Sequence, residues 1–350
     1  MVQQISAVIT AFILTFLITP LVTRFLFEKH IVDIPGKRKI HKAAKPSLGG
    51  IPIFIGYLLA SLIWVNLQEW KNIKFILLAQ STIFIIGVRD DLLPLKAIYK
   101  LMGQVLAATI AIFLFDVRIA SCYGFLGVYE IPEALSYALT YITLIGITNS
   151  LNLIDGLDGL AGTIAGIIFL FFGVWFFLAG ENINSILAFA LLGGILAFLI
   201  YNWQPSSIFM GDTGSLLIGL TIAMFTIRFM NVNYSLPDSA FAKFGSTVGV
   251  AVCVIVILLV DTLRIIILRL LKRQSPFTPD KSHVHHAISR LGMTHSQTTL
   301  ILAGVQLLFI SLAIIFNQLG DHYIVPGAVL LSILLSVFLD RLIFNRVSGP

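Results

Sequence analysis

The sequence predicts an all-helical protein that crosses a membrane many times. Hydrophobic residues make up 58% of the 350 residues and charged residues 11%, whereas a soluble domain has about 25% charged residues. The mean hydropathy of +0.97 agrees, because a soluble chain of this length would need far more polar surface. No internal repeat or low-complexity segment is visible, so residues 1–350 are expected to form a single membrane domain.

Apolar runs of the length that crosses a bilayer, about 20 residues, recur along the whole chain. They predict eleven spans, at residues 4–27, 48–67, 73–88, 97–115, 133–150, 158–179, 184–200, 213–230, 243–268, 297–316 and 322–340. The first run is too long for a cleaved signal, and no Lys or Arg precedes Arg24. We therefore expect it to be a retained helix.

Basic residues are concentrated on one of the two sets of alternating loops. Fifteen Lys and Arg residues lie on the side of loops 28–47, 89–100 and 272–296, and four lie on the opposite side. The positive-inside rule then places the N-terminus outside and the C-terminus in the cytoplasm. It also accounts for the net charge of +6, and no basic stripe interleaved with aromatic residues indicates a nucleic-acid partner.

Aspartates recur in three loops of the predicted cytoplasmic face. They are Asp90, Asp91, Asp155, Asp158 and Asp212. Clustered carboxylates repel one another unless a cation or a proton offsets them, and Mg²⁺ is a natural candidate because it takes oxygen ligands. For any one of them the alternative is a helix N-cap, and Asp158, just before Gly159 and Leu160, fits that alternative.

Glycines flank these aspartates where loops meet helices, as in the stretch GDTGS at residues 211–215. There the backbone can approach a ligand closely, and a helix N-terminus favours anions. The stretch therefore fits a phosphate or metal-phosphate site. The alternative is an ordinary turn capped by Thr213 or Ser215.

Histidines and cations lie on the same face. The stretch HVHH contains His283, His285 and His286 and predicts a loop that contacts a diphosphate, or else a solvated loop; a zinc site lacks a visible partner. Asp261 and Arg264 are spaced as an intrahelical ion pair.

The basic stretch RKIHKAAK ends at Lys45. This stretch could bind anionic lipid headgroups or steer a soluble anion. Lys100, just inside the fourth predicted span, either snorkels to the interface or holds a lipid phosphate at headgroup depth.

Taken in order, these motifs resemble those of the bacterial polyprenyl-phosphate N-acetylhexosamine-1-phosphate transferases. The resemblance covers about residues 30–290. It rests on GG at 49–50, DD at 90–91 with KLMGQ at 100–104, NLIDGLDGLAG at 152–162, YNxxP at 201–205, FMGDTGS at 209–215, DTLR at 261–264 and HVHH at 283–286.

Within that family, RKIH and HxHH resemble the branch that begins O-antigen (lipopolysaccharide), common-antigen or teichoic-acid synthesis. The peptidoglycan branch usually shows PTMGG where this chain has PSLGG at residues 46–50. This difference disfavours UDP-MurNAc-pentapeptide as the substrate, although a phospho-MurNAc-pentapeptide transferase is the alternative within the family.

The resemblance implies a Mg²⁺-dependent enzyme of the bacterial cytoplasmic membrane, with its active-site cleft on the cytoplasmic face and Mn²⁺ as a possible substitute. It would transfer GlcNAc-1-phosphate from UDP-GlcNAc to undecaprenyl phosphate, giving undecaprenyl-diphosphate-GlcNAc and UMP, as the first membrane step of a cell-envelope glycan. It leaves a homodimer open. Direct attack by the lipid phosphate and a covalent aspartyl-phosphate both fit; direct attack is preferred because that phosphate is already an anionic nucleophile.

The resemblance also assigns residues to roles. The catalytic residues would be Asp90, Asp91, Asp155 and His283. The metal ligands would be Asn152 and Asp212. The substrate-binding residues would be Lys45, Lys100, Asp158, Asn202, Phe209, His285 and His286. Among these, Phe209 would stack on uracil and Lys100 would contact the lipid phosphate.

A transporter or lipid flippase is the rival from another class. Transporters place ionisable residues near mid-membrane, often in repeated halves. Here the acidic residues lie at loop edges on one side, which favours the enzyme.

Overall fold

The computed structural model describes residues 1–32, 45–271 and 283–347, and within these ranges it contains helices and no strand. The α-helices are α1 (Val2–Glu28), α2 (Gly50–Trp64), α3 (Trp70–Leu92), α4 (Ala97–Phe115), α5 (Glu133–Ile154), α6 (Leu160–Leu178), α7 (Asn182–Asn202), α8 (Gly211–Ser235), α9 (Thr247–Val254), α10 (Val256–Leu271), α11 (Val284–Arg290), α12 (His295–Phe316) and α13 (Asp321–Val347). The predicted all-helical class is confirmed.

Eight of the described helices are long and apolar enough to cross a membrane, by length and composition. They are α1, α4, α5, α6, α7, α8, α12 and α13, and each corresponds to a predicted span. The segments predicted at 48–67 and 73–88 correspond to α2 and α3, and α2 has only 15 residues. The count of eleven therefore stays a prediction.

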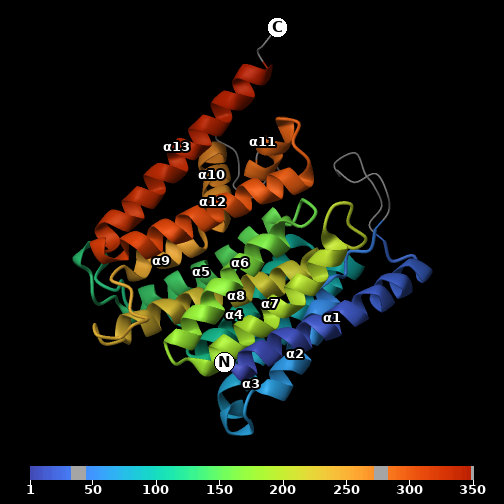
Figure 1. Cartoon of the computed structure of the whole chain (residues 1–350), viewed down its shortest axis with the longest axis horizontal. Helices are drawn as coiled ribbons and strands as arrows, with labels where there is room; N and C mark the ends of the chain where they lie inside the picture. Colours follow the sequence, from blue (N-terminus) through green and yellow to red (C-terminus); the bar gives the residue numbers. More distant parts are fainter. Residues whose placement is uncertain (33–44, 272–282, 348–350) are drawn as a thin grey trace.

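The segment predicted as one span at 243–268 is broken. It consists of α9 and α10, whose axes differ by 79°, with the break at Ile255. Counted as one bent span, this pair raises the number of candidate spans to nine. Figure 1 shows α10 turning away from the bundle, with α13 along the outer side of the molecule.

The central element of the bundle is α8 (Figure 1). It packs against α2, α3, α5, α6 and α9, and most of its side chains are buried. Three polar side chains inside the bundle are hydrogen-bonded to one another: Tyr57 Oη donates to Gln80 at 2.7 Å, and Gln80 Nε2 donates to Thr221 Oγ1 at 2.9 Å. Because a membrane core offers no water to such groups, this chain of hydrogen bonds joins α2, α3 and α8.

The N-termini of α2 and α8 meet closely because both begin with glycine. A Cβ atom on Gly50 would lie 2.2 Å from the backbone nitrogen of Gly214, a distance that no side chain tolerates. The N–H groups of Gly49 and Gly50 donate to the carbonyl oxygens of Phe209 and Met210, at 2.9 and 3.0 Å. The GG pair thus ties the FMGDTGS stretch to the start of α2.

The predicted orientation can be tested at Cys122. This residue is partly exposed in the connection between α4 and α5, whereas Cys253 is buried in α9. We expect a membrane-impermeant maleimide added to intact protoplasts to label Cys122, and Cys122→Ser to remove the label.

The matched control places a cysteine on the opposite side. Ser207 is exposed between α7 and α8, so Ser207→Cys in the Cys122→Ser background should react only after lysis. The reverse pattern would contradict a cytoplasmic position for this face.

Candidate active site

Two carboxylates and an amide from three helices, α3, α5 and α8, converge on the ammonium group of Lys100, near the start of α4. Lys100 Nζ lies 2.6 Å from Asp212 Oδ2, 3.2 Å from Asp90 Oδ2 and 3.4 Å from Asn152 Oδ1. All four side chains are partly buried. The sequence-predicted residues Asp90, Lys100, Asn152 and Asp212 therefore form one cluster, here called the lysine cluster.

Asn152 joins the end of α5 to the start of α8. Its Nδ2 donates to Asp212 Oδ1 and, at 2.8 Å, to Ser215 Oγ. Ser215 Oγ in turn donates to the carbonyl of Gly211 at 2.9 Å. The two predicted metal ligands, Asn152 and Asp212, are therefore neighbours. The hydroxyl group of Ser215, the last residue of GDTGS, holds Asn152 in place.

Asp91 binds the N-terminus of α8 from another helix. Its Oδ1 accepts the N–H of Asp212 at 2.9 Å, and its Oδ2 accepts the N–H and the hydroxyl of Thr213 at 2.9 and 2.6 Å. The first N–H groups of a helix lack intrahelical partners, so Asp91 supplies the cap. The alternative of a turn capped by Thr213 or Ser215 is wrong, because Thr213 donates to Asp91 and Ser215 donates to Gly211.

Only glycine fits at position 211, where α8 begins. The backbone φ there is +70°, and a Cβ atom would lie 1.7 Å from the carbonyl oxygen of Ser47. A left-handed conformation and a backbone contact both exclude a side chain. This explains the glycine that precedes Asp212 in the motif.

A second cluster lies between Lys45 and the loop before α8. Asp158 accepts the hydroxyl of Ser206 at 2.9 Å and lies 3.9 Å from Lys45 Nζ. Lys45 also donates to Ser206 Oγ at 3.0 Å, and its Nζ lies 5.2 Å from the centre of the Phe209 ring. These residues are here called the Phe209 cluster.

Asp158 does not cap α6, so the N-cap alternative is wrong for this residue. The N-cap position is Gly159, and it has no side-chain cap bond. Burial alone would raise the pKa of the Asp158 carboxyl group, but the nearby His295 ring, hydrogen bonds from Ser206 and the charge of Lys45 hold it below its usual value. Asp158 is therefore an ionised group that pairs with a cation.

Asn202 joins two loops. It is buried at the end of α7, where its Oδ1 accepts the N–H of Gly159 and its Nδ2 donates to the carbonyl of Ile208, both at 2.9 Å. The Asn202 amide therefore connects the loop before α6 to the loop before α8, and both loops carry residues of the Phe209 cluster.

Asp155 lies in the loop between α5 and α6. Burial raises the pKa of its carboxyl group well above the usual value, and the charges of Asp212 and Asp91 raise it further. Asp155 is thus electrostatically linked to the lysine cluster, and a divalent cation nearby would favour its ionised form.

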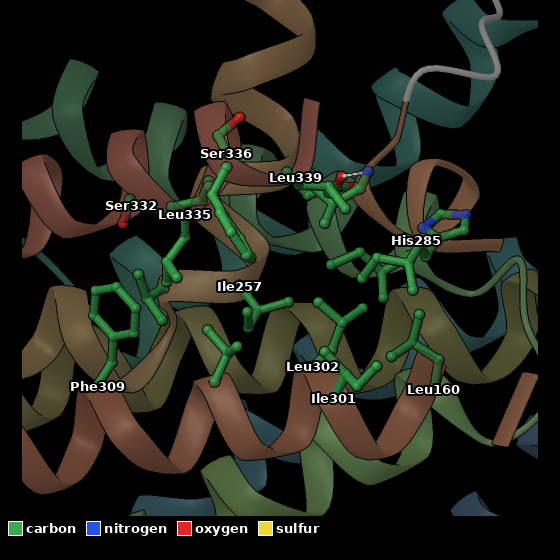
Figure 2. A pocket seen from close by; sticks show the side chains of 18 of the residues that line it. Leu160, Ile257, His285, Ile301, Leu302, Phe309, Ser332, Leu335, Ser336 and Leu339 are labelled. Atoms are coloured by element: carbon green, nitrogen blue, oxygen red, sulfur yellow. Dashed lines mark hydrogen bonds between the residues drawn. The ribbon is translucent and has the colours of Figure 1, made fainter. Parts of the chain in front are cut away.

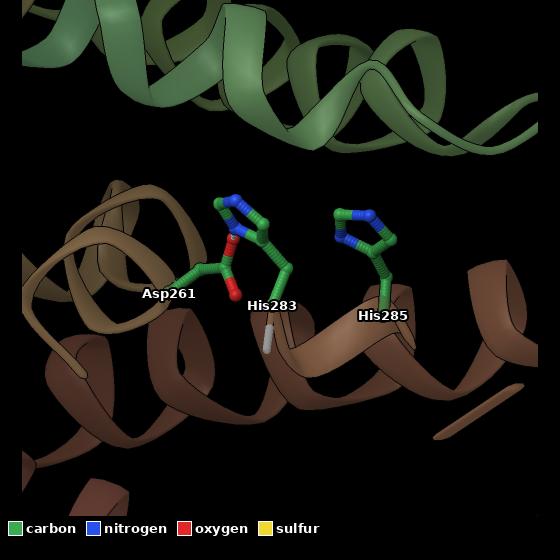
Figure 3. A group of neighbouring side chains, drawn as sticks. All are labelled: Asp261, His283 and His285. Atoms are coloured by element: carbon green, nitrogen blue, oxygen red, sulfur yellow. Dashed lines mark hydrogen bonds and ion pairs between the residues drawn. The ribbon is translucent and has the colours of Figure 1, made fainter. Parts of the chain in front are cut away.

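A third group consists of Asp261 from α10 with His283 and His285 at the start of α11 (Figure 3). Asp261 Oδ2 lies 2.7 Å from His283 Nδ1, and its Oδ1 accepts the N–H of Val284 at 2.6 Å. An ionised carboxylate only accepts hydrogen bonds, so His283 Nδ1 carries the proton and Nε2 is the ring nitrogen that can accept one.

The predicted intrahelical pair of Asp261 and Arg264 is wrong. Arg264 instead contacts Asp340 of α13 at 2.6 Å. The atoms of Asp261, His283 and His285 that could bind a metal ion lie within 4.8 Å of one another. Asp261 is therefore a possible ligand beside the two histidines, which the sequence spacing did not reveal. The Asp261–His283 hydrogen bond nevertheless accounts for this contact without an ion.

His285 brings this third group to the NLIDGLDGLAG loop. Its Nε2 lies 3.1 Å from the position that a Cβ atom on Gly156 would take. Gly156 therefore leaves room for the ring. The side chain of His286 lies outside the described part of the structure.

An apolar cavity of about 330 Å³ lies beside this group. Figure 2 shows His285 at one end of it and Phe309 at the other, with Leu335 and Leu339 of α13 along one wall. Side chains of α10 and α12, among them Ile257 and Leu302, also line it, together with Leu160 of α6. The cavity extends from a pair of polar groups into the apolar part of the protein.

Sequence reasoning missed Asp261, Ser206 and His295 as site residues. Asp261 lies within the DTLR stretch, and that motif was the available signal. Ser206 and His295 stand in no motif of this kind, and only folding brings them to Asp158.

The residues of the lysine cluster suit a magnesium ion. Asp90, Asn152 and Asp212 present three oxygen atoms to one ammonium group, and carboxylate and amide oxygens are the ligands that Mg²⁺ takes. The fold and this cluster define an all-helical membrane protein with a polar site at the ends of its helices.

Comparison with known proteins identifies the family. The family model described as glycosyl transferase family 4 matches residues 73–230. A probable undecaprenyl-phosphate N-acetylglucosaminyl 1-phosphate transferase of Bacillus subtilis is 30% identical over 323 residues, covering 91% of this chain and 86% of that protein. The chain therefore belongs to glycosyl transferase family 4.

More distant relatives cover similar lengths. A decaprenyl-phosphate N-acetylglucosaminephosphotransferase of Mycobacterium tuberculosis is 29% identical over 93% of this chain and 86% of its own length. An undecaprenyl-phosphate alpha-N-acetylglucosaminyl 1-phosphate transferase of Yersinia pestis is 27% identical over 88% of this chain and 82% of its own length.

The neighbouring aspartates should differ in their effect on stability. Asp91→Asn replaces one of the two acceptor oxygens by an NH₂ group, which would face the N–H and hydroxyl donors at the start of α8. The loss of these hydrogen bonds should lower the free energy of unfolding by about 1–3 kcal/mol. The unfolding midpoint in detergent should fall accordingly. Asp90→Asn is the matched control, because an amide oxygen can still accept the N–H of Leu95, now at 2.6 Å from Asp90 Oδ1. Equal midpoints for the two variants would contradict the capping role of Asp91.

Proposed function

We propose that this protein transfers GlcNAc-1-phosphate from UDP-GlcNAc to a polyprenyl phosphate and releases UMP. The observation that carries the proposal is the convergence of Asp90, Asn152 and Asp212 on Lys100 at the ends of membrane helices. The names of the relatives describe transfer to undecaprenyl phosphate or decaprenyl phosphate. Their bacterial origin supports a place in the bacterial cytoplasmic membrane, and the basic loops support a site that faces the cytoplasm.

Asp212 and Asn152 would hold Mg²⁺, with Asp155 close enough to be affected by its charge. When bound, the ion would neutralise charge on the donor diphosphate, which is a large part of catalysis in phosphoryl transfer. Asp91 keeps Asp212 in place through the backbone of α8.

The acceptor phosphate would bind at Lys100 and Asp90. An ammonium group has three donors, so Lys100 can contact Asp90 and a phosphate oxygen together. Asp90 would orient the attacking oxygen or remove its remaining proton. That oxygen forms a bond to the phosphorus that carries the sugar, and the bond from this phosphorus to the UMP oxygen breaks.

The Phe209 cluster would hold the nucleotide. The Phe209 ring is partly exposed, and an aromatic side chain can stack on a base, while Lys45 near that ring could contact a phosphate. Asn202 fixes the two loops on either side of the cluster.

His283 would contact the diphosphate or the sugar through Nε2, with its orientation set by Asp261. The apolar cavity beside Asp261 and His285 fits the isoprenoid chain of the acceptor, because it joins a polar site to apolar surroundings.

The activity is tested with purified protein, UDP-GlcNAc and undecaprenyl phosphate. UMP release should require the lipid phosphate and Mg²⁺, with Mn²⁺ as a substitute, and it should stop in excess EDTA. Asp212→Asn should abolish turnover while leaving the unfolding midpoint within a few degrees. UMP release without lipid phosphate, or full activity in EDTA, would contradict the proposal. Other UDP-sugars in the same assay identify the preferred donor.

The two substrate sites should respond separately to mutation. A stacking contact on a base is worth about 1–3 kcal/mol, so Phe209→Ala should raise KM for UDP-GlcNAc by roughly 5- to 150-fold and leave kcat nearly unchanged, because the contact is distant from the reacting bond. Phe209→Trp should be tolerated far better.

The reciprocal variant is Leu335→Trp, which fills the apolar cavity and should raise KM for the lipid phosphate only. An unchanged KM for UDP-GlcNAc in folded Phe209→Ala protein would show that Phe209 does not hold the base.

A further inference from the structure

The break between α9 and α10 is bridged by the side chain of Gln306, which lies in α12 and is fully buried. Gln306 Nε2 donates to the carbonyl oxygens of Cys253 and Val254, at 3.1 and 2.8 Å. The N–H of Ile257 donates to Gln306 Oε1 at 3.4 Å. One amide group therefore contacts backbone on both sides of the bend.

In a straight helix the N–H of Ile257 would donate to the carbonyl oxygen of Cys253. The bend breaks this bond. Gln306 Oε1 instead accepts the N–H of Ile257, and Gln306 Nε2 donates to the carbonyl oxygen of Cys253. Sharp kinks occur where a side chain inserts into the helical hydrogen-bond ladder. Within a membrane domain such a replacement is needed, because backbone groups without a partner are costly there.

The bend determines where α10 points. Asp261 lies in α10, five residues after Val256, the first residue of that helix. Its carboxylate contacts His283 and Val284. Other contacts of α10, such as that of Thr262 with Ser150 at 2.8 Å, hold the helix beyond the bend.

We propose that Gln306 is a positioning residue for the reaction: it fixes the 79° bend and so directs Asp261 to His283. Its effect on catalysis rests on the proposed function, whereas its effect on the bend does not.

The bend is tested by the distance between spin labels on α10 and α12. Leu263→Cys and Leu300→Cys are suitable sites because both leucines are exposed, at 52% and 61%, and Cys122→Ser removes the accessible native thiol. Gln306→Met keeps the approximate volume but has no amide, so the distance distribution should shift or broaden. Leu307→Met, on the exposed face of the same helix, is the control and should leave it unchanged.

Gln306→Asn is the milder variant in case Gln306→Met does not fold. It keeps an amide but is one methylene shorter, so it should not reach both sides of the break. Distance distributions identical to the parent in every folded variant would overturn the proposal.

The role in catalysis is tested by a double-mutant cycle with Asp261→Asn. Gln306→Met and Asp261→Asn should each lower kcat/KM by about tenfold or more. If Gln306 acts through Asp261, the double variant should match the slower single variant within about twofold. A loss equal to the product of the two single losses would overturn the proposed route. An inactive parent protein would refute the proposed function, and the label distances would still decide whether Gln306 fixes the bend.

Discussion

The N-terminus of α8 is held by the carboxylate of Asp91, which accepts two backbone N–H groups and one hydroxyl. Because α8 is the central helix of the bundle, its first turn cannot move without disturbing its neighbours. Asp212 lies in that turn, and its side chain contacts Lys100 and Asn152. A carboxylate beside the helix N-terminus is also electrostatically favourable. The geometry of the lysine cluster therefore depends on a cap supplied by another helix.

Charge balance is the second constraint on this face of the protein. Asp90 and Asp212 share Lys100, and Asp158 lies near Lys45 and His295. Lys100 and Lys45 can each also contact an anionic substrate. The carboxylates of Asp90 and Asp212 keep Lys100 in place, and that of Asp158 keeps Lys45 beside it.

The membrane environment gives two buried glutamines far from the site a structural role, because unpaired backbone and side-chain polar groups are costly there. Gln80 connects Tyr57 to Thr221 within the bundle, and Gln306 connects the two halves of a broken helix. In both places an amide serves as donor and acceptor at once. The first contact holds straight helices together, whereas the second permits a bend that brings Asp261 to His283.

The sequence by itself determined the helical membrane class, the positions of most spans and the residues of the lysine cluster. These follow from long apolar runs and from polar motifs at their ends, which are local properties of the chain. Neighbours on a helix point about 100° apart, which agrees with Asp90 contacting Lys100 while Asp91 contacts the start of α8.

Tertiary structure alone decided which partner each of these side chains meets. Asp91 caps α8, Asp158 binds Ser206 rather than its own helix, and Asp261 pairs with His283 rather than with Arg264. The predicted span at 243–268 is broken because Gln306, some 50 positions away, supplies the hydrogen bonds that a bend requires. Apolar content predicts that a segment is buried, but its direction depends on which distant polar group is available to satisfy its backbone.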